Sequence, residues 1–394
     1  PQALANTAWA YSTAEVAAPS LFEAIASAAL PQIEAFTPQA LANTTWAFAT
    51  AGVPAPSLFE AIAHETVPKI AAFTPQGLSN TAWAYSTAGV PAPFLFEAIS
   101  SASILKIDAF KPQELANTAW AYSTAGVAAP SLFEAIARAA TSKIDAFEPQ
   151  HLANTACAFA KAGVNAAWAY SKAGIAAPSL FEAIAGAALT KADFFTPEAL
   201  AGVAWAYSTA GVAAPKLFEA IAVNAASKID AFDPQALANT AWAYSTAGVA
   251  APALFKAIAR AAAPKIGEFT PQNLANTAWA YSTAGISAPA LFEAIARAAA
   301  PKIGEFTPQT LANTAWAYSK AGISAPALFE AIARAAASPP RVSRRRLFRK
   351  SASRRSRVLR LRRSTRSPRR QSSLRRISRT RPGRTRQRES RRRL

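Results

Sequence analysis

The chain has 394 residues with 42 Lys+Arg and 22 Asp+Glu, a formal net charge of +20 at pH 7, one cysteine and two histidines. A single cysteine excludes an internal disulfide and a cysteine-rich zinc site. Two histidines, without a recurring cluster of acids or a Gly-rich phosphate-binding loop, give catalysis no support. We therefore expect no enzyme, metal site, cofactor or small-molecule substrate.

Residues 1–337 repeat one unit, whose most constant phrase, LANTAWAYSTAG, is complete at residues 115–126, 237–248 and 274–285. Seven of the eight intervals between the prolines that open the copies are 37 residues, and one is 48. A fixed period of this size is typical of a solenoid of supersecondary units, so we predict nine repeats instead of several globular domains. The opening prolines are Pro1, Pro38, Pro75, Pro112, Pro149, Pro197, Pro234, Pro271 and Pro308.

Each unit predicts two helices. In the eighth copy, Thr270 is a natural N-cap, Pro271 occupies the first helical position, and Gly285 ends the helix as a left-handed residue. We call this first helix of each unit helix A. Pro289 starts the second, helix B, and Pro301 is expected to stop it. The predicted fold is all-α: an α-solenoid, a right-handed superhelix of αα-hairpin repeats with helix A on the concave side.

Tryptophan follows the Asn-Thr-Ala core of almost every helix A, and we expect its ring to be buried in the core instead of stacking on bases. The exception lies in the 48-residue interval, where 11 residues are inserted near 157–168 and Cys157 takes the tryptophan slot. We expect Cys157 to be a core residue. Because Gly163 argues against a continuous helix, a bulge or extra turn is predicted there.

A polar face is predicted on helix A from its third, sixth, tenth and thirteenth residues, counting the opening proline as first. A constant amide beside a variable neighbour is typical of a modular reader. The alternative is that the amides hydrogen-bond between adjacent repeats while the third position is merely solvated. The sixth position gives Asn6, Asn43, Asn80, Asn117, Asn154, Asn239, Asn276 and Asn313, with Gly202 as the exception; candidates at the third position are Glu114, His151, Asn273 and Thr310, and at the thirteenth Lys161 and Lys320.

A lysine recurs near the end of helix B, just before the turn. Evenly spaced cations are candidates for contacts with a phosphate backbone, but each also suits the C-terminal end of its own helix dipole. Both interpretations stay open at this point. The column consists of Lys69, Lys106, Lys143, Lys191, Lys228, Lys265 and Lys302.

Residues 338–394 form an Arg/Ser-rich tail with 25 Lys+Arg and one acid, whereas residues 1–337 carry 17 Lys+Arg and 21 acids, or −4. The composition predicts disorder and suggests a nucleic-acid arm. Permitted codons for residues 371–393, read two bases further on, also encode EFTPQNLANTAWAYSTAGISAP, the sequence of residues 268–289. We therefore interpret the tail as a frame-shifted continuation of the array, with a true basic arm as the alternative.

The unit FTPQ.LANTAWAYSTAG…P.LFEAIA resembles the octotricopeptide and heptatricopeptide repeats of organellar RNA-binding proteins. It is also similar to repeats of the RAP-domain, FAST-kinase-like and RNA-editing substrate-binding complex families. The resemblance covers residues 1–337. It implies an α-solenoid that binds transcripts in a mitochondrion or chloroplast and governs their processing, stability, editing or translation, with RNA-processing proteins as further partners.

The predicted function is therefore sequence-dependent binding of single-stranded RNA, at roughly one nucleotide per repeat as in other helical-repeat readers. A protein-binding scaffold of the HEAT or armadillo kind is the alternative, because the array is nearly neutral. Phosphate contacts weaken steeply with salt and an apolar protein groove does not, so salt dependence distinguishes the two. No apolar run approaches the ~20 residues of a membrane span. The chain begins inside a repeat, so we read it as a fragment whose targeting segment is not visible.

Overall fold

The computed structural model describes residues 1–169 and 177–337. Within these two ranges eighteen α-helices follow one another and no strand is present, which confirms the predicted all-α solenoid. The tail, 338–394, with its predicted disorder and shifted reading frame, lies outside the described residues. No helix in the described part of the chain is long and apolar enough to span a bilayer.

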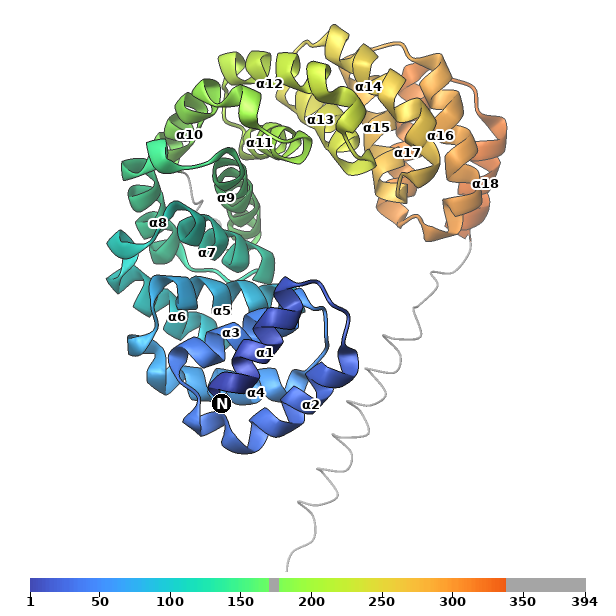
Figure 1. The fold of residues 1–394 in the computed structure, drawn as a ribbon. Helices are drawn as coiled ribbons and strands as arrows, with labels where there is room; N and C mark the ends of the chain where they lie inside the picture. The colour runs from blue at the N-terminus through green and yellow to red at the C-terminus, as the bar shows by residue number, and fades with distance from the viewer. Residues whose placement is uncertain (170–176, 338–394) are drawn as a thin grey trace, which may run out of the picture. The chain divides into compact units, whose positions relative to one another are not determined.

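The helices form two layers within the unit Pro1–Ala337. Each helix A packs on the next helix A, and from the second repeat onward each helix B packs on the next helix B, whereas the first two B helices both pack on the 3-10 turn Leu30–Ala35. Figure 1 shows the odd-numbered helices on the inner side of the curved array and the even-numbered helices on the outer side. The A helices are α1 Gln2–Thr13, α3 Pro38–Thr50, α5 Pro75–Ala88, α7 Pro112–Ala125, α9 Pro149–Ala169, α11 Pro197–Ala210, α13 Pro234–Ala247, α15 Pro271–Ala284 and α17 Pro308–Ala321. The B helices are α2 Pro19–Ala29, α4 Pro56–Lys69, α6 Pro93–Leu105, α8 Pro130–Ser142, α10 Pro178–Thr190, α12 Pro215–Lys228, α14 Pro252–Lys265, α16 Pro289–Lys302 and α18 Pro326–Ala337.

The predicted helix signals are present in the structure, with one correction. The hydroxyl oxygen of Thr270 accepts a hydrogen bond from the backbone N–H of Asn273, 3.2 Å away, at the start of α15. Gly285 has φ +68° and ends the helix in the left-handed conformation that glycine adopts without strain. Pro301, however, does not stop α16, which runs one residue further, to Lys302. In the last turn a proline costs only one hydrogen bond, so the helix tolerates it.

A short 3-10 turn links each helix B to the next helix A. Its last residue is followed by a buried phenylalanine, such as Phe269, whose extended backbone turns the chain into the next N-cap. These turns are η1 Leu30–Ala35, η2 Ile70–Ala72, η3 Ile107–Ala109, η4 Ile144–Ala146, η5 Ala192–Phe194, η6 Ile229–Ala231, η7 Ile266–Glu268 and η8 Ile303–Glu305.

A buried tyrosine joins each of six repeats to the one before it. The ring of Tyr281 in α15 meets that of Phe255 in α14 edge to face, with centroids 5.0 Å apart. Its hydroxyl donates a hydrogen bond of 2.5 Å to the Phe255 carbonyl oxygen. Burial raises the pKa of the Tyr281 hydroxyl, so it remains a protonated donor at all ordinary pH values. The same bond, 2.5–2.6 Å long, is made by Tyr85, Tyr122, Tyr207, Tyr244 and Tyr318.

Two repeats have phenylalanine in this slot, which provides a natural test of the hydroxyl. Phe48 and Phe159 keep the edge-to-face pair with the preceding phenylalanine at 5.0 Å but have no hydroxyl to donate. We expect Tyr281→Phe to lower the free energy of unfolding by about 1 kcal/mol, and Phe48→Tyr to raise it by up to about 1 kcal/mol. Urea denaturation followed by circular dichroism measures both. The two variants must change the free energy of unfolding in opposite directions. A Phe48→Tyr variant that is less stable than the parent contradicts the prediction.

The inserted residues lengthen a helix and do not interrupt it. Helix α9 continues through Gly163 to Ala169, so the predicted bulge or extra turn near Gly163 is wrong over this range. One glycine costs a helix only about 1 kcal/mol, which the packing of α9 against α7 and α11 offsets. Residues 170–176, which precede α10, lie outside the described part of the chain.

Candidate nucleic-acid interface

One strip of every helix A remains accessible, and we call it face A. It consists of the second, sixth, ninth and thirteenth residues of each helix A, which helix geometry places within about 60° of arc. In α15 these are Gln272, Asn276, Trp279 and Thr283, of which Gln272 is exposed and the others half-buried. No residue at these four positions is buried in any of the nine A helices, where described. Face A is therefore a polar and aromatic surface repeated every 37 residues, except at the insertion.

The predicted polar face needs correction, because its third and tenth positions lie against neighbouring helices. The tenth position is alanine, and Ala280 is fully buried. At the third position, Asn273 is only 9% exposed and Thr310 only 2%. Sequence reasoning missed the second position, where an exposed glutamine recurs. Binding of RNA by the third-position residues stays a prediction.

The two remaining third-position candidates act at the helix start. A carboxylate oxygen of Glu114 accepts a hydrogen bond of 2.8 Å from the backbone N–H of Lys111, and Nδ1 of His151 accepts one of 3.3 Å from Glu148. These residues replace the threonine cap that other repeats use, and so their side chains point back toward the N-terminus. Burial lowers the pKa of His151, partly opposed by the charge of Glu148, which favours the neutral imidazole that can accept this bond.

The asparagine column hydrogen-bonds within its own helix. Nε2 of Gln272 donates to Oδ1 of Asn276 over 2.7 Å, and the same pair recurs in α1, α9 and α17 at 2.8–2.9 Å. Both partners of each pair lie in the same helix, so these pairs do not support the alternative of hydrogen bonds between adjacent repeats. Among residues 1–169 and 177–337, the Nδ2 group of Asn276 and the Oε1 of Gln272 have no protein partner, so each pair presents one amide donor and one acceptor outward.

The tryptophans are partly buried, so the core prediction holds only in part: Trp46, Trp83, Trp120, Trp205 and Trp279 pack against the core without being enclosed by it. Trp242, Trp279 and Trp316 follow one another with ring centroids 6.4 and 6.3 Å apart and ring planes 32° and 28° apart. At the two ends of the array, Trp9 is 46% and Trp316 45% exposed. The ninth position lies at the edge of the apolar arc, so the indole packs in part against the core while the rest stays accessible. The buried aromatic residue of helix A lies two residues later, and it is tyrosine in six repeats and phenylalanine in two.

The two interruptions of face A lie next to each other. Cys157 takes the tryptophan slot of α9 and Gly202 the asparagine slot of α11, and the Cys157 thiol donates to the Gly202 carbonyl oxygen over 3.2 Å. A Cβ atom at position 202 would come within 3.3 Å of Sγ. Burial raises the pKa of Cys157 to about 12, so the thiol stays protonated at neutral pH and is a poor nucleophile or metal ligand. Its predicted core role fits this environment.

The lysine column bonds to the preceding repeat. Nζ of Lys265 donates to the carbonyl oxygens of Asp230 and Phe232, both 2.8 Å away, in and after η6. Two of the three ammonium protons are thus used, and a phosphate could share only the third. These hydrogen bonds give the lysine a role between repeats that the sequence did not predict, while a dipole interaction with its own helix and phosphate contact both stay predictions. The same two bonds are made by Lys69, Lys106, Lys143, Lys191, Lys228 and Lys302.

The repeat at residues 1–37 departs from this column. Its lysine position is occupied by Gln32, whose Nε2 donates to the carbonyl oxygen of Ala28, 2.8 Å away at the end of its own helix B.

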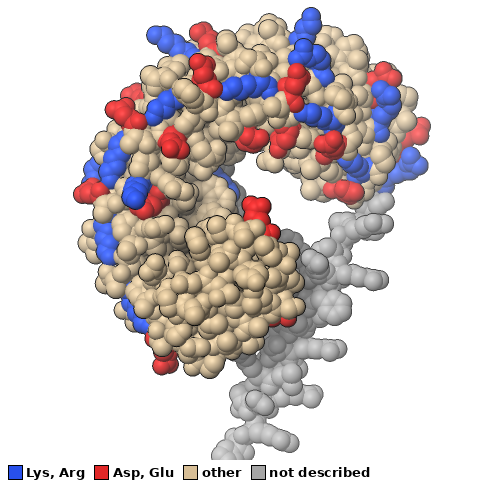
Figure 2. Space-filling view, in the orientation of Figure 1, with Lys and Arg blue, Asp and Glu red and all other residues tan. Residues whose placement is uncertain are grey.

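Few charges lie on face A. At the thirteenth position Lys161 is exposed, with Nζ 3.4 Å from Oγ1 of Thr124, and Nζ of Lys320 lies 4.7 Å from the centroid of the Trp316 ring. Glu198 replaces the glutamine in α11. Figure 2 shows most of the visible Lys and Arg side chains along the outer part of the array, over the even-numbered helices. Face A therefore offers amides and aromatic rings in place of a basic surface.

A comparison with known protein families matches residues 2–166 and 162–341 to the RNA-editing substrate-binding complex 6 protein family. The chain belongs to this family. The two matches meet at residues 162–166, inside the insertion in α9, so each covers roughly half of the array. A search of the curated proteins finds no match. Membership relates the chain to RNA editing and to a complex with RNA and protein partners.

Proposed function

We propose that this chain binds single-stranded RNA within an RNA-editing complex, and that face A makes the contact. The observation that supports the proposal best is the row of partly exposed tryptophans Trp242, Trp279 and Trp316 beside outward-facing amides. Base stacking on aromatic rings contributes about 1–3 kcal/mol per base and tolerates any sequence. Asparagine and glutamine amides can then read the Watson–Crick edges of bases that are splayed out of a helix.

Affinity for RNA would come from stacking and amide contacts more than from phosphates. Lys161 and Lys320 are the cations on face A among the described residues, and the lysine column is already bonded to carbonyl oxygens. Each phosphate contact adds about 0.7 to the slope of log affinity against log salt for a single strand. We therefore expect a slope of about 1–2, shallower than that of a protein that binds RNA through a basic surface.

The test is fluorescence anisotropy with labelled single-stranded homopolymer RNAs and a duplex control, at about 50–200 mM salt. Residues 1–337 form one compact unit, so this fragment separates face A from the arginines of the tail. Binding of single strands in preference to duplex supports the proposal. A dissociation constant weaker than about 10⁻⁴ M at physiological salt, the weak end of non-specific binding, rejects it and favours the scaffold.

The amides should set base preference. We expect Asn117→Ala, Asn239→Ala and Asn276→Ala together to reduce the affinity for the preferred homopolymer by about tenfold and to bring the four homopolymers closer together, because a good amide–base pair discriminates by about 1–3 kcal/mol. Anisotropy titrations on all four RNAs measure this. Glu293→Ala on the exposed side of α16 is the matched control. An equal loss on all four RNAs would contradict base reading by these residues.

The family also supports a mitochondrial location, and we propose the mitochondrion in preference to the chloroplast. The basis for this choice is that the family belongs to an RNA-editing complex. Fractionation of the native cells, with detection of the protein by antibody, tests it, and recovery in plastids would contradict it.

A further inference from the structure

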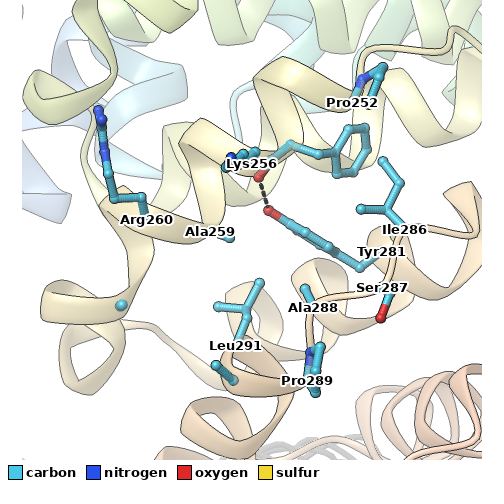
Figure 3. Close-up of a pocket in the computed structure, with 13 residues that line it drawn as sticks. Pro252, Lys256, Ala259, Arg260, Tyr281, Ile286, Ser287, Ala288, Pro289 and Leu291 are labelled. Atoms are coloured by element: carbon cyan, nitrogen blue, oxygen red, sulfur yellow. Dashed lines mark hydrogen bonds between the residues drawn. The ribbon is translucent and has the colours of Figure 1, made fainter.

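A cavity of about 580 Å³ lies away from face A, between the seventh and eighth repeats. Phe255 of α14, Tyr281 of α15 and Leu291 of α16 form its apolar wall together with Ile286 of the loop between α15 and α16. Figure 3 shows α14 on one side of the cavity, where the Tyr281 hydroxyl bonds to the Phe255 carbonyl oxygen. The start of α16, with Pro289 and Leu291, lies on the opposite side. None of its lining residues belongs to face A.

An equivalent cavity two repeats earlier is about 300 Å³. Its wall contains Phe181, Tyr207 and Leu217 at the same positions of the repeat, 74 residues before their counterparts. Among the differences between the two linings, Leu189 lies in the smaller cavity at the position that Ala263 takes in the larger. The smaller side chain of Ala263 leaves room for a large apolar group.

The rim of the larger cavity is also exceptional in charge. Lys256 stands on α14 where the eight other B helices all have glutamate, and Arg260 follows one turn later. Arg260 lies 3.6 Å from the carboxylate of Asp230, but their side chains are 69% and 84% exposed, so the pair is weak and Arg260 is accessible to another acid. The glutamates at the position of Lys256 are Glu23, Glu60, Glu97, Glu134, Glu182, Glu219, Glu293 and Glu330.

We propose that this cavity is a docking site for a protein partner, which inserts one large apolar side chain and places acidic residues against Lys256 and Arg260. The wall formed by Phe255, Tyr281, Ile286 and Leu291 is apolar, and the Tyr281 hydroxyl already donates to the Phe255 carbonyl oxygen, so the wall suits an apolar side chain better than a base. Two cations spaced one helical turn apart select for carboxylates on the partner. Lys256 reverses the charge that glutamate gives the other repeats, whereas Arg260 has counterparts in Arg138, Arg297 and Arg334. The site is independent of RNA binding on face A.

The experiment selects short random peptides displayed on phage against the full chain, with RNA removed by nuclease. Enriched peptides should share a large aliphatic or aromatic residue within one helical turn of Asp or Glu. Ala263→Leu, which copies Leu189, should weaken a selected peptide at least about tenfold by filling the cavity. Lys256→Glu, which copies the other repeats, should weaken it about threefold and remove much of its salt dependence. Ala226→Leu, at the same position of α12, is the matched control and should change nothing.

Each substituted residue already occurs at the same position of another repeat, so both variants are compatible with the fold. Circular dichroism of each variant verifies this. Equal peptide binding by the parent and Ala263→Leu overturns the proposal, as does the absence of any enriched peptide. Loss of single-stranded RNA binding in Lys256→Glu would instead assign the rim to RNA. Self-association that Ala263→Leu abolishes, seen by analytical ultracentrifugation, would assign the cavity to a second copy of the chain.

Discussion

Replacing Trp242, Trp279 and Trp316 together with leucine should lower the affinity of residues 1–337 for single-stranded RNA at least about 100-fold. The three rings form the part of face A in which neighbouring centroids lie 6.3–6.4 Å apart, and stacking of a base on an aromatic ring contributes about 1–3 kcal/mol. Leucine retains apolar packing on the next repeat while removing the flat surface. Anisotropy titration with a homopolymer RNA measures the loss.

Two controls separate stacking from damage to the array. The same three positions changed to phenylalanine keep an aromatic surface and should lose less than about tenfold. Tyr281→Phe destabilises the neighbouring repeat interface without touching face A, and it should leave RNA affinity unchanged below the unfolding temperature. If the leucine variant binds RNA as the parent does while remaining folded, the tryptophans do not stack on bases and the proposal for face A fails.

The fold could be predicted almost entirely from the sequence, because its signals are local. A proline at the first helical position, a threonine cap and a glycine such as Gly285 fix the ends of each helix within the repeat itself. The fixed period then requires the repeats to stack. Gly163 misled the prediction because its cost of about 1 kcal/mol is smaller than the packing energy along α9.

The site was less predictable, since it depends on contacts between repeats. An apolar residue such as Trp279 at the edge of a helical arc is buried or exposed according to how closely the next helix approaches. That distance cannot be inferred from the sequence of a single repeat. Asn273 was misplaced for the same reason, because the third position is buried once the repeats stack. The lysine bonds connect residues 33–35 positions apart in most repeats, which a reading of single helices could not reveal.

Lys265→Met should lower the free energy of unfolding by about 2–4 kcal/mol while leaving RNA affinity within about twofold. Methionine keeps the length and apolar packing of the lysine stem but cannot donate hydrogen bonds to the Asp230 and Phe232 carbonyl oxygens. Hydrogen bonds from a charged donor contribute about 1.5–3 kcal/mol each, and partial access of water to these carbonyls limits the combined loss. Urea denaturation and amide hydrogen exchange in α12 and α14 measure the opening of this repeat interface.

Lys216→Met provides the matched control, because Lys216 is an exposed lysine of α12. It should change stability by less than about 0.5 kcal/mol. A phosphate-contact role for Lys265 predicts the reverse pattern: unchanged stability, weaker binding of every RNA sequence, and a salt slope lower by about one. Because the two roles change different measurements, the single variant decides between them. A stable Lys265→Met protein with a reduced salt slope would return the lysine column to the RNA-binding surface and leave the inter-repeat carbonyls solvated by water.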